Sequence, residues 1–391
     1  MDVLSLYLHI PFCRHRCAYC DFNTYAGMEN LIADYVTALI AELGCAAAGL
    51  PPNARVHTLF LGGGTPSLLP LSEVSRLLSA VRDGFPLTSG AEITLEANPG
   101  TLSREYLRGL RSLGVNRLSL GMQSASPEDL RILERGHDFF DVVQAVKWAR
   151  QAGFGNLNLD LIFGLPYQSL ASWQRTLELA LDLRPDHLSL YHLTLEHGTP
   201  MNSWVQRGLL PAADSDLAAE MYEWAMARLE KAGFEQYEIS NWARRSADGR
   251  LLACQHNLQY WHNLPYLGLG AGAHGFAAGC RTVNVRGPQA YINRCRNGAA
   301  RPFPRTPATV HLTPIDRATE MAETMMMGLR LVQEGVPDRA FRQRFGVSIE
   351  AAFPREIHEL RTQGLVEWSQ GRLRLTARGK MFGNRVFMRF V

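Results

Sequence analysis

Three cysteines near the start of the chain have the spacing of a metal site. Cys13, Cys17 and Cys20 follow one another as C-x3-C-x2-C. A structural zinc site usually takes four ligands in two separated pairs, and no second pair is well placed in this sequence. Three thiolates in one loop instead suit three irons of a 4Fe–4S cluster, and Arg14 and Arg16 are expected to lower the thiol pKa values. We therefore predict a cluster, with zinc or unligated core cysteines as the alternatives.

The first half of the chain predicts the scaffold that would position this loop. Between residues 3 and 190 a short apolar strand, a turn and an amphipathic helix recur. The predicted strands are Leu4–His9, Val56–Leu61, Glu92–Ala97, Arg117–Gly121, Leu157–Ile162 and His187–Tyr191. The predicted helices are Leu31–Ala48, Leu71–Asp83, Arg104–Leu113, Asp138–Ala152 and Ser172–Leu183. This α/β alternation predicts a parallel sheet, and six units favour a partial (β/α)6 barrel over a closed barrel of eight.

Residue types suited to chemistry recur at the ends of the predicted strands and in the loops that follow them. Cys13–Cys20, Gly62–Pro66, Glu96–Pro99 and Gln123 follow strands, whereas Asp160 and Tyr191–His192 close theirs. In parallel barrels the loops at the carboxyl ends of the strands build the active site. The three glycines let the backbone approach a ligand closely and offer it exposed amides. We therefore expect one shared site at this end of the barrel.

The rest of the chain predicts smaller units. We expect residues 1–235 to form the barrel, residues 236–300 to extend it, and the proline-rich residues 301–314 to form a linker. Residues 315–391 predict a small C-terminal domain. Its expected elements are helices over Arg317–Val332, Ala340–Phe345 and Glu350–Thr362, and a hairpin of Leu365–Trp368 and Arg372–Leu375. Helices followed by a hairpin resemble a winged-helix module, which serves as a DNA-binding unit or as a structural cap.

Composition favours a soluble protein of the cytoplasm. Hydrophobic residues make up 46% and charged residues 20% of the 391 positions. No apolar run is expected to span a membrane, and the N-terminus lacks the features of a signal peptide. A net charge of +3 is too small to argue for nucleic acid, so the basic C-terminal tail is interpreted as a solvated face. The odd count of seven cysteines argues against a disulfide framework.

The cysteine spacing, with Tyr19 before the last cysteine, resembles the radical S-adenosylmethionine (SAM) family. The resemblance implies that the amino and carboxylate groups of SAM bind the open iron. It also implies that an electron from the cluster splits the sulfonium to give a 5′-deoxyadenosyl radical.

Motifs along nearly the whole chain narrow this resemblance to the HemN-like group. They are Tyr7–Cys13, Gly62–Pro66, Gly121–Gln123, Glu134–His137 and Asp160–Pro166. The resemblance implies SAM contacts from Tyr7, Tyr19, Gly63, Gly64, Thr65 and Glu96, and from Gln123, Arg135 and Asp160 in the remainder of the pocket. A buried pair of Arg135 and Asp160 could equally be structural.

Two features separate the members of this group. Oxygen-independent coproporphyrinogen III dehydrogenase has a further cysteine where this chain has Phe22, and an N-terminal extension where this chain starts six residues before Tyr7. The segment from His256 to Trp261 resembles the HNxxYW motif of the heme chaperones. An imidazole suits heme iron, and Tyr260 and Trp261 offer flat faces to a macrocycle. Two alternatives remain: His256 is a hydrogen-bonded residue of the core, or Cys254 is the residue that binds the heme.

These features together predict a heme chaperone that carries a 4Fe–4S cluster, SAM and heme. It would deliver heme to heme-dependent proteins, including membrane-bound respiratory ones, and would lie peripherally at the membrane through these partners. A homodimer is left open. No catalytic residue is assigned. The alternatives are coproporphyrinogen III dehydrogenase, another radical SAM enzyme of tetrapyrroles, and a winged-helix regulator with a redox-sensing cluster. Secondary ligand candidates are His192, His197, His262 and His274, while Met325–Met327 is interpreted as core.

Overall fold

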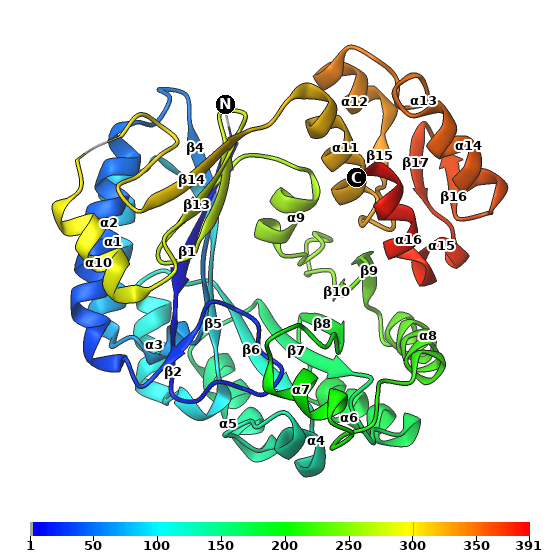
Figure 1. The fold of residues 1–391 in the computed structure, drawn as a ribbon. Helices are drawn as coiled ribbons and strands as arrows, with labels where there is room; N and C mark the ends of the chain where they lie inside the picture. The colour runs from blue at the N-terminus through cyan, green and yellow to red at the C-terminus, as the bar shows by residue number, and fades with distance from the viewer. Residues whose placement is uncertain (1–2, 300) are drawn as a thin grey trace.

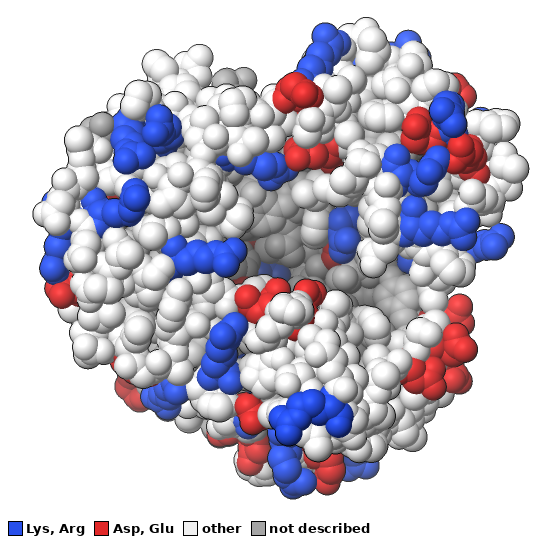
Figure 2. Space-filling view, viewed as in Figure 1, with Lys and Arg blue, Asp and Glu red and all other residues white. Residues whose placement is uncertain are grey.

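The computed structural model describes residues 3–299 and 301–391, so residues 1, 2 and 300 of the expected domains lie outside the described residues. Its main feature is one curved, open sheet of twelve strands in the order β14-β13-β12-β11-β1-β4-β5-β6-β7-β8-β10-β9. Figure 1 shows helices on the outer side of this sheet. The face seen in Figure 1 is hollowed at its centre in Figure 2, with acidic and basic side chains around the rim.

Six neighbouring parallel strands form the centre of the sheet and confirm the predicted partial barrel. They are β1 (Val3–Ile10), β4 (Arg55–Gly63), β5 (Leu87–Ala97), β6 (Arg117–Gln123), β7 (Leu157–Phe163) and β8 (His187–His192). The connecting helices are α1 (Ile32–Ala48), α2 (Leu71–Gly84), α3 (Arg104–Ser112), α4 (Pro127–Ile132), α5 (Phe139–Gln151) and α6 (Leu170–Asp182). Leucine-rich strands are covered by the apolar faces of these helices, as expected for a parallel sheet.

The two flanks of the sheet were predicted only in part: residues 236–300 were expected to extend the barrel, and a strand was expected near Glu235–Ile239, which is β9. On one side β11 (Tyr266–Leu269) pairs in parallel with β1, and an antiparallel series follows: β12 (His274–Ala277), β13 (Cys280–Asn284) and β14 (Thr309–Pro314). On the other side β10 (Asn241–Ala243) and β9 (Glu235–Glu238) continue from β8. Residues 301–314 were predicted to form a linker, whereas β14 is a hydrogen-bonded edge strand. Strands of three to six residues carry too little periodicity to be recognised.

Shorter elements connect these strands. The remaining helices before the C-terminal module are α7 (Pro200–Gln206), α8 (Ser215–Lys231), α9 (Gln255–Trp261) and α10 (Pro288–Asn297). The small pair β2 (Phe12–Cys13) and β3 (Tyr25–Ala26) brackets the cysteine loop. Short 3-10 turns lie at η1 (Glu29–Leu31), η2 (Pro66–Leu68), η3 (Pro99–Thr101) and η4 (Met388–Phe390).

The C-terminal module has its own hydrophobic core. It contains α11 (Arg317–Gly328), α12 (Asp338–Phe345), α13 (Ile349–Ala352), α14 (Pro354–Thr362), α15 (Ala377–Met381), α16 (Gly383–Phe387), β15 (Val336–Pro337), β16 (Val366–Ser369) and β17 (Arg372–Leu375). The predicted hairpin is confirmed: β16 and β17 pair across Gln370 and Gly371, which both have a positive φ, as a tight hairpin turn requires. The module, orange to red in Figure 1, lies beside α9.

One helical stretch differs from the expectation that no segment could cross a membrane. Glu29–Ala48 is long and apolar enough to do so, with a mean hydropathy of 1.6. However, Tyr35, Val36, Leu39 and Leu43 of α1 are buried in the main core. We therefore interpret it as a core helix.

Candidate functional site

A cavity of about 360 Å³ at the carboxyl ends of the parallel strands contains the three cysteines, and we call it the cysteine cavity. Cys13 ends β2, and Cys17 and Cys20 lie in the loop that follows. Other predicted residues line the same space: Tyr19, Gly63, Gly64, Thr65, Glu96, Gln123, Arg135 and Asp160. The structure therefore brings together residues that lie up to 147 positions apart, counted from Cys13 to Asp160.

The surroundings of the thiols differ from the sequence expectation. Burial raises the pKa of Cys13 and of Cys20, and Arg16 only partly offsets this for Cys20. Arg16 thus lowers the pKa of Cys20 as predicted, but in the cluster-free chain the cost of desolvating the thiolate outweighs this effect. The closest donors are instead the Thr65 hydroxyl, 3.6 Å from the Cys13 sulfur, and Arg135, whose Nη1 lies 3.4 Å from the Cys17 sulfur.

The thiols do not converge on one point. Within the described parts of the chain no three His, Cys, Asp or Glu side chains are grouped to hold a single metal ion. A cubane cluster takes one thiolate at each of three irons, so its ligands need not converge in this way.

The glycine loop after β4 orients its neighbours and does not present free amides. The N–H groups of Gly63, Gly64 and Thr65 donate to Glu96 Oε2, to the Ile10 carbonyl and to the Phe12 carbonyl, at 3.0, 2.8 and 2.8 Å. A Cβ at Gly64 would lie 2.7 Å from the Phe12 carbonyl oxygen, so only glycine fits there. The expected exposed amides at these three positions are therefore not available.

Arg135 and Asp160 both line the cavity but form no ion pair with each other. Arg135 donates to the carbonyl of Gly121 at 2.9 Å and to the Asn98 side chain. Asp160 accepts from Ser119 at 3.0 Å and from Asn158 at 2.8 Å. The alternative of a structural Arg–Asp pair does not occur.

Gln123 reaches the cavity through an irregular strand end. The register between β6 and β7 shifts between Leu120 and Gln123, and Gln123 has a positive φ of 64°. A bulge of this kind changes the direction of a side chain, and a non-glycine residue with positive φ costs free energy that functional sites often hold.

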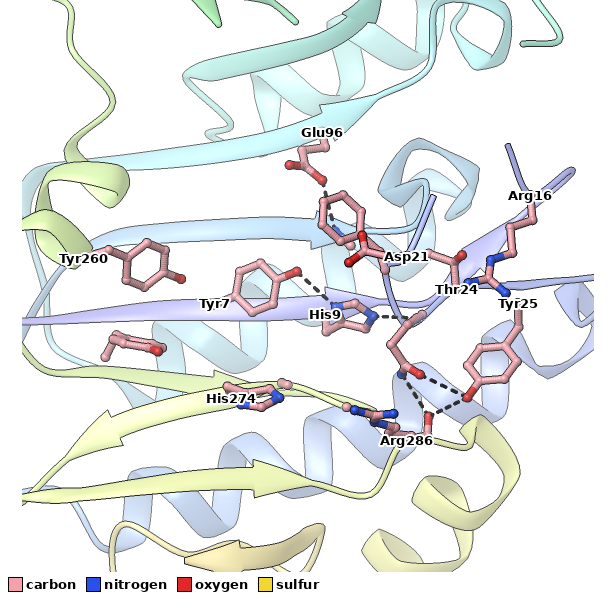
Figure 3. A pocket seen from close by; sticks show the side chains of 16 residues that line it. Tyr7, His9, Arg16, Asp21, Thr24, Tyr25, Glu96, Tyr260, His274 and Arg286 are labelled. Atoms are coloured by element: carbon pink, nitrogen blue, oxygen red, sulfur yellow. Dashed lines mark hydrogen bonds between the residues drawn. The ribbon is translucent and has the colours of Figure 1, made fainter. Parts of the chain in front are cut away.

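A second cavity of about 550 Å³ adjoins the first, and we call it the tyrosine cavity after Tyr7, Tyr260 and Tyr266. The two cavities share six lining residues: Arg16, Asp21, Phe22, Thr24, Gly63 and Glu96. Figure 3 shows Tyr7 and Tyr260 at one end, with His274 and Arg286 on the side opposite Glu96. Tyr7, predicted to contact SAM, thus lies in the tyrosine cavity, where its hydroxyl is 3.0 Å from Nδ1 of His9.

His256 lies behind the wall of this cavity, with an exposed fraction of 1%. The Thr58 hydroxyl donates to Ser5, so Nδ1 of His256 must donate to Thr58, at 2.8 Å. Burial lowers the His256 pKa to about 3, so the ring is neutral and its Nε2 accepts from the Tyr260 hydroxyl at 2.8 Å. In this conformation both ring nitrogens have partners.

Trp261 and Cys254, which are close to His256 in the sequence, also lie outside the tyrosine cavity. Trp261 packs beneath the C-terminal module, with the Arg330 guanidinium 4.4 Å from its ring centre. Cys254 is fully buried, donates to Glu92 at 3.6 Å, and has a pKa raised to about 12 by burial. Cys254 therefore stays protonated near neutral pH and lines neither cavity. Of the HNxxYW side chains, the structure brings only Tyr260 to the tyrosine cavity.

Two parts of the chain match known protein families. Residues 7–180 match the radical SAM superfamily, and residues 315–382 match the HemN C-terminal domain. The chain is 38% identical over 390 residues to the heme chaperone HemW of Bacillus subtilis, covering 99% of both chains. This chain belongs to the HemN-like group of the radical SAM superfamily.

Other members of the group extend the same similarity. Heme chaperone HemW of Mycobacterium tuberculosis is 38% identical over 385 residues, covering 98% of this chain and 93% of the relative. The mitochondrial radical S-adenosyl methionine domain-containing protein 1 of Bos taurus is 36% identical over 380 residues, covering 93% and 81%. The fold matches coproporphyrinogen III oxidase (HemN) of Escherichia coli with a TM-score of 0.84 and 24% identity, over 100% of this chain and 90% of that chain.

Membership of the radical SAM superfamily implies a 4Fe–4S cluster and SAM, and the cysteine cavity fits both. It contains three thiols and, at its side, the Glu96 carboxylate. Nε of Arg135 is buried and has no hydrogen-bond partner among residues 3–299 and 301–391. An unpaired buried donor beside a cavity is the expected sign of a polar ligand that completes it.

Several residues of these cavities had no role assigned from the sequence. Asn98 accepts from Arg135 and donates to Thr65 at 3.1 Å, so it links two predicted residues. Tyr266 and Arg286 line the tyrosine cavity because β11 inserts beside β1. No signal in the sequence predicts this insertion, since β11 is only four residues long.

Replacing Glu96 with glutamine should stabilise the cluster-free chain above pH 7. Burial first, and Asp160 second, raise the pKa of Glu96 from 4.5 to about 7. The pKa of Glu96 is higher in the folded chain than in the unfolded chain, so ionising Glu96 lowers the free energy of unfolding. This loss is absent below about pH 4.5, grows as pH rises, and is complete above about pH 7, where it is at most about 3 kcal/mol. In thermal unfolding across this pH range, the Tm of Glu96→Gln should rise relative to the Tm of the wild-type chain as pH rises. A gain that does not change with pH, or an equal gain in the surface control Glu223→Gln, would contradict this.

Proposed function

We propose that this protein is a heme chaperone, which binds heme in the tyrosine cavity and passes it to heme-dependent proteins. The observation that carries the proposal is a cofactor-sized aromatic cavity that adjoins the cysteine cavity, in a chain 38% identical over its whole length to the heme chaperone HemW of Bacillus subtilis. We include membrane-bound respiratory proteins among the acceptors and place the chaperone in the cytoplasm.

Phe22 supports the carrier function at the junction of the two cavities. Its side chain is 64% exposed although it is a large apolar group, and it lines both spaces. An aromatic ring that is held open to a cavity offers a face on which a flat macrocycle stacks. A cysteine at this position would offer no such face.

The HNxxYW segment has a distinct role for each side chain in this proposal. Tyr260 forms part of the cavity wall and makes an edge contact with Tyr266, with ring centres 4.5 Å apart. His256 holds the Tyr260 hydroxyl, and Trp261 anchors α9 to the C-terminal module through Arg330. The segment thus shapes the heme site and couples it to the module.

The cysteine cavity keeps its predicted cofactor role within this proposal. Cys13, Cys17 and Cys20 would hold the cluster, which supplies an electron to bound SAM. The proposed SAM contacts are Tyr7, Tyr19, Gly63, Gly64, Thr65, Glu96, Gln123, Arg135 and Asp160. Because Gly63 and Glu96 also line the tyrosine cavity, a ligand in either cavity would lie against these two residues.

The test is a heme titration of the cluster-reconstituted chain, followed by transfer to an apo-heme protein. We expect one heme per chain with a Kd of about 1 µM or tighter, and heme transfer to the acceptor. Absence of saturable heme binding would overturn the proposal.

Coproporphyrinogen III dehydrogenase is the second candidate, because the fold matches HemN of Escherichia coli with a TM-score of 0.84. Anaerobic incubation with coproporphyrinogen III, SAM and a strong reductant separates the two functions. We expect no protoporphyrinogen to form. Steady formation of protoporphyrinogen would favour the dehydrogenase over the heme chaperone.

A further inference from the structure

Three histidines lie in or behind the tyrosine cavity, and their ring nitrogens differ in what they contact. His256 is bonded at both nitrogens, to Thr58 and Tyr260. His9 is also bonded at both, to the Tyr7 hydroxyl at 3.0 Å and to the Asn23 carbonyl at 2.9 Å. His274 is exposed in the cavity, and Figure 3 draws no hydrogen bond to its ring from the lining residues.

The backbone beneath His274 is fixed by close packing of two glycine-containing strands. A Cβ at Gly268 would lie 1.8 Å from the His274 carbonyl oxygen, so β11 and β12 approach too closely for any other residue. On its other side His274 pairs with Val283 of β13. The imidazole therefore projects from a rigid strand, which is the support that a ligand position requires.

We propose that His274 supplies the axial imidazole to the iron of a heme held in the tyrosine cavity. Burial first, and then Arg286 and Arg281, lower the pKa of His274, so the ring is neutral at physiological pH and has a lone pair to donate. His256 has no free lone pair in this conformation and would have to displace the Tyr260 hydroxyl to bind iron. This inference rests on the proposed function and names the iron ligand within it.

The charges around His274 suit the carboxylates of a heme. Arg286 and Arg16 line the cavity, and both side chains are exposed. The Arg286 backbone is held by Asn23 and Tyr25, which donate to its carbonyl at 3.0 and 3.3 Å. Arg16 and the two acidic lining residues, Asp21 and Glu96, lie at the junction with the cysteine cavity, whereas Arg286 lies on the side of His274. We therefore expect the propionates to point toward Arg286 and the porphyrin face to lie near Phe22 and Tyr266.

Heme titrations of single variants of the full-length chain test the assignment. His274→Ala should shift the Soret band and weaken binding of iron protoporphyrin IX about tenfold or more. Added free imidazole should restore the wild-type band in this variant. Binding of iron-free protoporphyrin IX should change less than about twofold, because the cavity walls are intact.

Matched histidine variants make the outcome decisive. His256→Ala should keep the Soret position, and His358→Ala, an exposed residue on α14, should match the wild-type chain in every measurement. A wild-type Soret band in His274→Ala, or a shifted band in His256→Ala alone, overturns the ligand but leaves the chaperone function. A wild-type chain that binds iron-free porphyrin and heme equally, with no ligand signature, also overturns the ligand. A wild-type chain that binds no heme overturns both proposals.

Discussion

Replacing Cys17 with serine should remove the iron–sulfur cluster completely. The three thiols are the ligands in our proposal, and serine oxygen is a poor substitute for a thiolate on iron. Reconstituted wild-type chain should contain about four irons and four sulfides, whereas Cys17→Ser should contain almost none and lose its broad visible absorption. Cys17 is only partly buried, and its sulfur accepts a hydrogen bond from Arg135 Nη1 at 3.4 Å. The loss should therefore come from ligation and not from unfolding.

A second cysteine gives the matched control. Cys45 on α1 is also a partly buried free thiol, and it lines neither cavity. Cys45→Ser should keep the wild-type iron content, and circular dichroism should show that both variants are folded. Full iron content in Cys17→Ser would exclude this residue as a ligand.

The sequence predicts the parallel centre of the fold well, and the reason is physical. Each strand from β1 to β8 in the parallel set is a short apolar run, and each is followed by a helix with an apolar face. The apolar runs and the helical periodicity are both local features of the sequence, so they can be recognised without knowledge of tertiary contacts. The carboxyl ends of the strands and the loops that follow them then place the cysteines, the glycine loop and Asp160 of β7 around one cavity, as predicted.

The tyrosine cavity could not be predicted because it depends on long-range pairing. Tyr266 and Arg286 reach it only because β11 joins β1 across more than 250 residues of sequence, as in the pair of Ser5 with Tyr266. The HNxxYW motif was recognised, but helical geometry separates its side chains. His256 and Tyr260 are four residues apart and share a face, whereas Trp261 is turned toward the C-terminal module. A motif fixes which residues are adjacent in sequence and not which face they present.

Replacing Arg330 with alanine should destabilise the protein strongly. The guanidinium lies 3.4 Å from Oε2 of Glu238, whose side chain is fully buried, and 4.4 Å from the ring centre of Trp261. Burial raises the pKa of Glu238 and Arg330 opposes this, so removal of the arginine leaves a buried carboxylate without its cation. Breaking one partner of such a pair costs about 3 kcal/mol.

Two comparisons test whether this cost arises from the unpaired charge. Arg330→Ala combined with Glu238→Gln should recover part of the loss, because the amide removes the charge that the arginine balanced. The exposed pair of Arg342 and Asp338 on α12 gives the control, since Arg342→Ala should cost no more than about 0.5 kcal/mol. Urea unfolding measures all three variants. If Arg330→Ala and Arg342→Ala lowered the free energy of unfolding equally, the buried ion pair between Glu238 of β9 and Arg330 of the C-terminal module would not hold these two parts of the fold together. A larger loss in the double variant than in Arg330→Ala would assign the cost to the packing of Trp261 beneath the arginine.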